Sequence, residues 1–240
     1  AEVRRAWCRG LNEYYADVWG GYADRMTPVA PIPMHTPAEA VAELEYVIGK
    51  LGLKAVMMPS WVKRPVRAVT MKYPDMADHA YWLDSFGIDS EHDYDPVWRK
   101  CQELRVIPTF HGSSEGLQFR NSISNIVYNH VGHFAAAADA VCKSLFLGGV
   151  PTRFPGLKFL FLEGGVGWAR SLLADLASHW EKRCLKGLAA NSAGPVTAGA
   201  VTTTKVSGRL GVAAAGSSVV LTNPNIDVNS KFAAFLSNAA

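Results

Sequence analysis

Continuous apolar runs, not alternating ones, mark the strands that this sequence predicts. Two of them, Val106–Phe110 and Leu157–Leu162, are each followed by an ionisable residue, His111 or Glu163, and then by glycine. A continuous apolar run is typical of a strand buried on both faces of a parallel sheet, and glycine lets the chain turn sharply afterwards. We therefore predict that His111 and Glu163 lie at the carboxyl ends of two parallel strands, where α/β folds hold their chemistry.

Apolar residues at helical spacing occupy the stretches between the strands. This pattern predicts helices over Glu2–Val18, Pro37–Leu51, Asp95–Leu104 and Val131–Leu147, and another from Trp168 onward. Further strands are predicted over Met26–Ile32 and Lys54–Pro59. Because the second helix lies between these two strands, the segment forms a βαβ unit.

The first two helices have distinct apolar faces. In the first, one face contains Val3, Trp7, Leu11 and Val18. The second starts with an N-cap at Thr36, a proline in its first turn and Glu39 in the position that completes a capping box. Its predicted buried stripe consists of Val41, Leu44, Ile48 and Leu51.

The remaining stretches are less regular. Trp61–Asp95 is predicted as a long loop with one short strand near Tyr81–Phe86, and Gly112–Asn129 as a second loop. After Cys184 the composition becomes rich in Ala, Gly, Ser and Thr. We predict a boundary there, with a domain over 1–184 and a low-complexity tail over 185–240. Within the tail, strand-like patterns occur at Val201–Thr204 and Ser218–Leu221.

Composition places the chain among soluble globular proteins. It has 240 residues, 49% of them hydrophobic, a mean hydropathy of +0.04 and a net charge of +3. The scattered Lys and Arg argue against nucleic-acid binding, and no apolar run is long enough to span a membrane. The four cysteines lie far apart without a C-x-x-C pair, as in a reduced cytoplasmic protein. Because the chain starts with Ala1 inside a helical pattern, we expect that a preceding segment is missing.

Several ordered motifs carry a family resemblance. They read E-A-V-A-E-L-E-Y-V-I-G-K-L-G-L-K-A-V-M-M-P-S, Y-D-P-V-W-R-K-C-Q-E-L, I-P-T-F-H-G-S and F-L-G-G-V-P-T-R-F-P-G-L-K-F-L-F-L-E-G-G-V-G-W. Over residues 1–183 the sequence resembles the amidohydrolase superfamily, in the branch related to aminocarboxymuconate-semialdehyde decarboxylase. The resemblance implies a (β/α)8 TIM-type barrel with a divalent metal, Zn or Mn, at the carboxyl ends of its strands. It also implies hydrolysis or non-oxidative decarboxylation of small acids, and often a homodimer.

The sequence also departs from the family pattern. The family's H-x-H pair on the first strand and its metal-binding Asp on the last strand have no counterpart, and Asp227 does not match the motif of that Asp. The barrel is therefore expected to be incomplete, with first and last strands missing or divergent. His111 matches the family's metal-binding His in F-H-G-S. Glu163 stands where the decarboxylases carry a catalytic His, so it is expected to act as an acid/base group or as a metal ligand.

Other candidates have weaker signals. His130 and His133 have a spacing that can bind metal on a helix, although a role in support of a site or at a helix start fits them better. The G-G-V-G sequence after the last strand could hold a phosphate, but it lacks the full fingerprint of a nucleotide site. A pocket for an aromatic acid could be lined by Trp61, Arg67, Tyr81, Trp82 and Arg120.

Two functions from different classes remain open. The first is a metal-dependent hydrolase or decarboxylase-like lyase acting on a small, aromatic or cyclic acid, with His111 as a metal ligand and Glu163 as the catalytic group. The second is a catalytically inactive barrel fragment that lacks the other metal ligands. Its unpaired strand edges would favour association with another chain.

Overall fold

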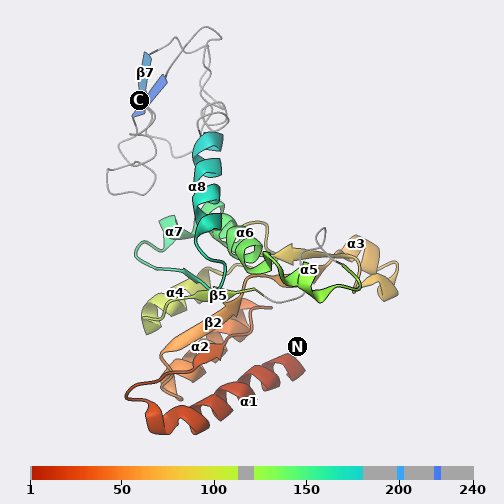
Figure 1. Ribbon diagram of the computed structural model, residues 1–240, viewed down its shortest axis with the longest axis vertical. Coiled ribbons are helices and arrows are strands. Elements are labelled where there is room, and N and C mark those ends of the chain that lie inside the picture. Colours follow the sequence, from red (N-terminus) through yellow and green to blue (C-terminus); the bar gives the residue numbers. More distant parts are fainter. Residues whose placement is uncertain (1, 113–121, 181–198, 203–218, 223–240) are drawn as a thin grey trace. The chain divides into compact units, whose positions relative to one another are not determined.

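The computed structural model describes residues 2–112, 122–180, 199–202 and 219–222 (Figure 1). Contacts divide the chain into two compact units, Ala1–Ala169 and Arg170–Ala240. Among the described residues, no helix has the length and apolar character needed to cross a membrane. The predicted boundary at Cys184 lies outside the described residues and stays a prediction.

The first unit contains a four-stranded parallel sheet. Its strands are β1 (Val29–Pro31), β2 (Ala55–Pro59), β5 (Thr109–His111) and β6 (Leu160–Phe161), and their order in the sheet is the order along the chain. All four lie within or at the ends of the strands predicted from apolar runs. Parallel neighbours in chain order are the arrangement of successive βα units in a barrel, and they bring all carboxyl ends to one edge.

The helix after β1, α2 (Pro37–Gly49), starts as its sequence predicts. The Thr36 hydroxyl accepts a hydrogen bond from the Glu39 backbone N–H at 3.3 Å, and Pro37 occupies the first turn. This bond satisfies one of the amide groups that a helix start leaves without an internal partner. The cap therefore fixes the residue at which the chain turns from β1 into α2.

The predicted buried stripe of α2 is partly wrong. Leu44 is fully buried, but Val41, Ile48 and Leu51 are only half-buried against the core. The other fully buried apolar residues of the helix are Ala40 and Val47. Because α2 packs against α4 (Asp95–Leu104) as well as the sheet, its buried face is turned toward that neighbour.

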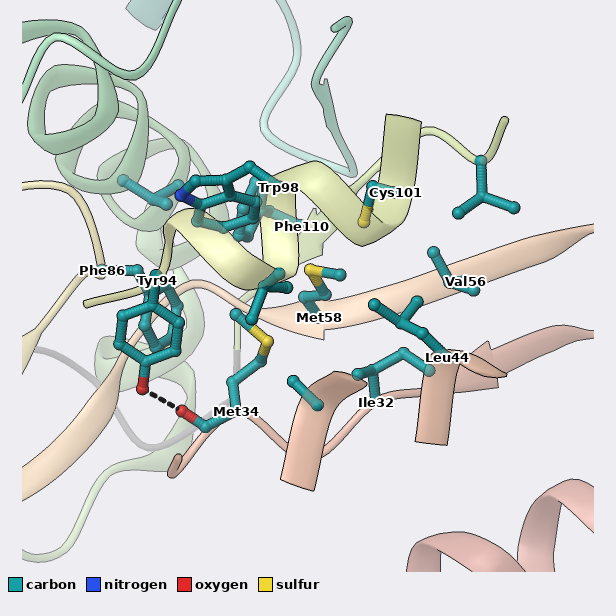
Figure 2. Packing of buried hydrophobic residues seen from close by; sticks show 14 of the residues in the cluster. Ile32, Met34, Leu44, Val56, Met58, Phe86, Tyr94, Trp98, Cys101 and Phe110 are labelled. Carbon is teal, nitrogen blue, oxygen red and sulfur yellow. Dashed lines mark hydrogen bonds between the residues drawn. The ribbon is translucent and has the colours of Figure 1, made fainter. Parts of the chain in front are cut away.

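The core lies between the sheet and helices α2 and α4, and aromatic rings fill its centre (Figure 2). Trp98 of α4 contacts Phe110 of β5 with ring centroids 6.3 Å apart. Phe110 also stacks against Phe161 of β6, with ring centroids 5.8 Å apart. The Tyr94 hydroxyl donates a hydrogen bond to the Met34 carbonyl at 2.5 Å, which ties the start of α4 to the chain after β1.

The segment predicted as a long loop is an antiparallel hairpin. Strand β3 (Val62–Pro65) pairs with β4 (Tyr81–Asp84), and a short helix α3 (Arg67–Thr70) and a 3-10 turn η2 (Pro74–Met76) lie between them. The sequence predicted only β4. Strand β3 has a single apolar residue before two charged ones, so a hydrophobic pattern could not show it.

A buried ion pair joins the two strands of this hairpin, and its arginine also binds the chain after β1. The Arg64 Nε donates to the Asp84 carboxylate at 2.9 Å, and both side chains are nearly fully buried. The other guanidinium nitrogens donate to the His35 carbonyl at 2.7 Å and to the Tyr94 hydroxyl at 2.8 Å. Burial, and then the positive charge of Arg4, lower the pKa of the His35 imidazole to about 4, so this ring is neutral in the folded chain at pH 7.

The helices after β5 are α5 (Ile126–His130), α6 (His133–Leu147) and α7 (Val150–Arg153), and α8 (Gly167–His179) follows β6. The predicted helix from Val131 therefore starts at His133, after a separate turn of helix. The end of α6 touches the chain after β4, where the backbone amides of Gly87 and Ile88 donate to the Ser144 hydroxyl at 3.1 Å each.

The first helix, α1 (Glu2–Trp19), forms where predicted and is followed by the 3-10 turn η1 (Gly20–Tyr22). Most of its predicted apolar face, however, is exposed. Val3 and Trp7 are 82% and 77% exposed, whereas Leu11 is half-buried.

In the second unit, β7 (Gly199–Thr202) pairs in parallel with β8 (Val219–Thr222), close to the two strand-like segments that the sequence predicted.

Candidate active site

The two strand-end residues meet at the carboxyl edge of the sheet. His111 is the last residue of β5, and Glu163 follows β6 by two positions. The parallel register pairs Thr109 with Leu160 and Phe110 with Phe161, so the next residues of both strands emerge side by side. The His111 Nε2 lies 2.7 Å from the Glu163 Oε2, with 30% and 58% of the two side chains exposed.

The two ring nitrogens of His111 face two different acceptors. Its Nδ1 lies 2.6 Å from the Gly112 carbonyl oxygen, and its Nε2 lies 2.7 Å from the Glu163 Oε2. A neutral imidazole can donate to one of these oxygens, and an imidazolium can donate to both. Imidazole and carboxylate are both groups that can take up and release a proton, so the pair can act as an acid or as a base.

Glu163 is held in a strained backbone conformation. Its φ is +63°, in the left-handed region that residues other than glycine rarely adopt, and the Gly164 amide donates to the Leu162 carbonyl at 2.9 Å across it. This three-residue turn is uncommon and costs about 1–3 kcal/mol. It turns the chain at once after β6 and directs the Glu163 carboxylate toward His111.

Two substitutions at Glu163 should therefore show how much this backbone strain costs in stability. Glu163→Gly and Glu163→Ala both remove the carboxylate, but only glycine adopts a positive φ without a Cβ penalty. We expect the Glu163→Gly chain to be more stable than the Glu163→Ala chain by about 1 kcal/mol. Urea unfolding at pH 7 measures the difference. Equal stability of the two variants would show that no strain is stored at this turn.

Two glycines let α6 begin close to the pair. A Cβ on Gly112 would lie 3.0 Å from the Ala137 Cβ, and one on Gly164 would lie 3.0 Å from the Ala135 Cα. The first turn of α6 therefore packs against both strand ends. From this turn the Phe134 ring contacts the His111 ring, with centroids 5.2 Å apart. The sequence did not single out Phe134, because an aromatic residue near a helix start gives no signal of its own.

The structure brings only two of the other candidates close to the pair, because the rings of His130 and His133 both contact Phe134. His130 is exposed and packs edge-on against Phe134, whereas His133 is buried with its ring edge-on to Trp61. Arg67 pairs with an acidic side chain at the protein surface. Arg120 and Asp227 lie outside the described residues. The turn with the sequence G-G-V-G leads into α8, and its valine is 85% exposed.

The donors in this part of the chain fit a divalent metal by type but not by number. An imidazole nitrogen and a carboxylate oxygen are ordinary ligands of Zn²⁺ and Mn²⁺, and the bond from Nδ1 to the Gly112 carbonyl is the support that metal-binding histidines usually have. A catalytic zinc site, however, takes three protein ligands. Among the described residues, no group of three or more His, Cys, Asp or Glu could hold a metal ion. The described residues therefore do not form a metal centre by themselves.

Comparison with solved structures finds similarity to three decarboxylases. The chain is 18% identical to 5-carboxyvanillate decarboxylase LigW from Sphingomonas paucimobilis, with a TM-score of 0.50, covering 66% of this chain and 41% of that one. It is 18% identical to 2,6-dihydroxybenzoate decarboxylase from Rhizobium, with a TM-score of 0.48 and coverage of 63% and 43%. A dihydroxybenzoic acid decarboxylase from Polaromonas sp. JS666, solved with manganese and the inhibitor 2-nitroresorcinol, is also 18% identical, with a TM-score of 0.47 and coverage of 65% and 42%.

At this level of identity the likeness concerns the fold. The chain spans less than half the length of each of these three proteins. Its described residues contain four neighbouring parallel strands with helices between them, which confirms the prediction of an incomplete (β/α)8 barrel. No curated protein matches the sequence. A family model described as Amidohydrolase matches residues 1–196, most of the chain. The protein therefore belongs to the amidohydrolase family.

Proposed function

We propose that this chain supplies the β5–β6 part of the reaction centre of a hydrolase or decarboxylase-like enzyme that acts on a small, aromatic or cyclic acid. The contact that carries the proposal is the 2.7 Å hydrogen bond between His111 and Glu163 at the carboxyl edge of the sheet. This is the edge where barrel enzymes bind their substrates. Membership of the amidohydrolase family and the likeness in fold to decarboxylases of aromatic acids support the choice of reaction.

The pair would serve as an acid and a base in turn. In hydrolysis, it takes a proton from water as the water oxygen bonds to the carbonyl carbon, and it returns a proton to the leaving nitrogen or oxygen. In decarboxylation, the bond to the carboxylate carbon breaks, its electron pair stays on the ring carbon, and a proton from the pair goes to that carbon as CO₂ leaves. Both sequences need a group that releases a proton and a group that takes one up, and the imidazole and carboxylate of this pair lie within hydrogen-bond distance of each other.

His111 is also the residue that we propose as a ligand of the family's Zn or Mn. Its Nδ1 is occupied by the Gly112 carbonyl, which leaves Nε2 to face the open edge of the sheet. Further ligands would have to come from outside the described residues, so we derive no step through the metal. A metal at Nε2 would compete with protons for that nitrogen, so metal binding should weaken as the pH falls.

Glu163→Gln should show whether Glu163 acts as an acid/base group or as a metal ligand. We expect it to lower turnover of a responsive aromatic acid by about 10²–10⁴-fold, because the amide cannot exchange a proton. The measurement is loss of substrate absorbance and release of CO₂ across a panel of aromatic acids, with Zn and Mn content determined on the same samples. The matched control is Asp139→Asn, which removes a partly exposed carboxylate paired with Lys143 on α6 and should leave the rate unchanged.

A second function, a barrel portion without catalysis, is favoured by one observation. The described residues offer two metal ligands where three are needed. This alternative predicts no turnover and no bound Zn or Mn in the unmodified chain. Metal bound at about one ion per chain and lost in His111→Ala would contradict it.

A further inference from the structure

Three connections from a helix to the next strand contain a residue with a positive φ. Gly52 precedes β2 with φ +69°, Arg105 precedes β5 with φ +56°, and Gly156 precedes β6 with φ +87°. Glycine adopts this left-handed conformation freely, and it is the usual residue just after the end of a helix. An arginine there has a Cβ that makes the conformation costly. Arg105 is the exception among three equivalent turns, and a strained residue of this kind often has a function.

Arg105 lines a surface cavity of about 350 Å³. Its walls are the turn from α4 to β5 and the turn from α7 to β6, which are joined by a 3.4 Å hydrogen bond from the Gln102 Nε2 to the Pro155 carbonyl. Both turns lead into the amino ends of their strands. Because the strands are parallel, the cavity lies at the sheet edge opposite to His111 and Glu163. It is therefore separate from the candidate active site.

Two cations without a partner line this cavity. The second is Lys158, in the turn before β6. Within the described part of the chain, neither the Arg105 guanidinium nor the Lys158 ammonium has a hydrogen bond or an ion pair. Lys100 of the same α4 helix, in contrast, pairs with Glu103 at 2.6 Å. None of the described residues that line the cavity is acidic. Two positive charges without a nearby acid attract an anion.

The rest of the lining favours an anion that has an apolar body. The Ile107 side chain is 40% exposed at the cavity, and Leu157 lies partly buried beside it. The backbone amides of Arg105, Val106 and Leu157 already donate to carbonyls within the two turns. Phosphate sites are commonly built from free backbone amides, whereas a carboxylate is held by the two parallel N–H donors of one guanidinium. The lining is therefore better suited to a carboxylate than to a phosphate.

We propose that this cavity binds a small organic acid, with its carboxylate on Arg105 and its apolar body against Ile107 and Leu157. Lys158 adds a second positive charge, although an ammonium lacks the planar donor geometry of a guanidinium. A glycine in place of Arg105 would relieve the strained turn but would remove the main partner of the ligand. The site lies away from the pair of His111 and Glu163 and does not depend on the proposed reaction.

Titration of the whole 240-residue chain with benzoate, followed by saturation-transfer NMR of the ligand, tests the proposal. We expect a dissociation constant of roughly 1 mM, because so small a ligand makes few contacts. Arg105→Gln should weaken binding by about 10-fold or more, since it removes charge-assisted hydrogen bonds, and Lys158→Gln by about 3-fold. The matched control is Arg99→Gln, which removes an exposed cation of α4 outside the cavity and should bind as the unmodified chain does.

Arg105→Gly distinguishes a ligand-binding role from a structural one. It removes the cation as Arg105→Gln does, but glycine adopts the positive φ without a Cβ penalty. We expect Arg105→Gly to unfold about 2–4 °C above Arg105→Gln, while both variants lose benzoate binding to the same extent. Thermal unfolding followed by circular dichroism measures the first difference and shows that both variants are folded.

Three results would overturn the proposal. The first is no binding of benzoate to the unmodified chain, or equal binding to the unmodified chain and Arg105→Gln. The second is binding that His111→Ala abolishes and Arg105→Gln does not, which would place benzoate at the candidate active site. The third comes from inorganic phosphate as a second probe. If phosphate binds as tightly as benzoate and is lost with Arg105→Gln, the apolar wall contributes nothing and the ligand is not an organic acid.

Discussion

Asp84→Ala should destabilise the first unit by about 3–5 kcal/mol. The substitution leaves the Arg64 guanidinium buried without its counter-ion, since the remaining partners of Arg64 are a carbonyl and a hydroxyl. It also removes the acceptor of the Phe86 amide, which Asp84 binds at 2.9 Å. A buried cation without compensation is among the most costly defects that a single substitution can create.

Urea unfolding at 25 °C measures the loss. Glu91→Ala is the control, because it breaks an ion pair of the same type with Arg67, whose side chain is 73% exposed. That pair should contribute less than about 1 kcal/mol. The double variant Arg64→Met with Asp84→Leu removes both charges together and should recover most of the stability. Equal effects of Asp84→Ala and Glu91→Ala would contradict our account of the buried pair.

Gly148→Ala should cost about 3 kcal/mol by a different mechanism. A Cβ at Gly148 would lie 1.8 Å from the Gly87 carbonyl oxygen, and one at Gly87 would lie 2.3 Å from the Ser144 carbonyl oxygen. Both obstacles are backbone atoms, so no side chain can rotate away. The chain after β4 would have to separate from the end of α6, which would break the hydrogen bonds from Gly87 and Ile88 to the Ser144 hydroxyl.

Thermal unfolding of Gly148→Ala, compared with a control variant, measures this loss of stability. Gly49→Ala, in the last turn of α2, meets no atom within 4 Å of its Cβ and should be neutral or raise stability by a few tenths of a kcal/mol. If Gly148→Ala unfolds at the same temperature as Gly49→Ala, the contact between Gly87 and the end of α6 does not hold the hairpin in place.

Local signals explain what the sequence could predict. The cap at Thr36 and the start of α4 at Asp95 are read from neighbouring residues alone, and both helices begin where expected. The parallel strands also followed from local apolar runs. The hairpin strand β3 did not, because its stability comes from the burial of Arg64 against Asp84, a residue on another strand.

The direction of a helix face and the geometry of a site depend on distant partners. Periodicity showed that Trp7 lies on an apolar face of α1, but only the ion pairs from Arg4 and Arg9 to α2 turn that face outward. The pattern of strand ends correctly brought His111 and Glu163 to one edge. The turn at Glu163 that lets their side chains meet has no sequence signal, since glutamate rarely adopts it. The catalytic and metal-binding roles of the two residues stay predictions.

The order of strands in the sheet bears on how the chain can fold as it leaves the ribosome. Each new strand pairs with the strand synthesised before it in the sheet, from β1 to β2, β5 and β6. No described strand of this sheet has to wait for a later one to be inserted between it and its neighbour. At about 5–20 residues per second, the stretch between β2 and β5 takes several seconds to appear. The β1–α2–β2 unit has that interval in which to form. Strand β5, which ends in His111, can then pair with β2, and β6, which precedes Glu163, can pair with β5.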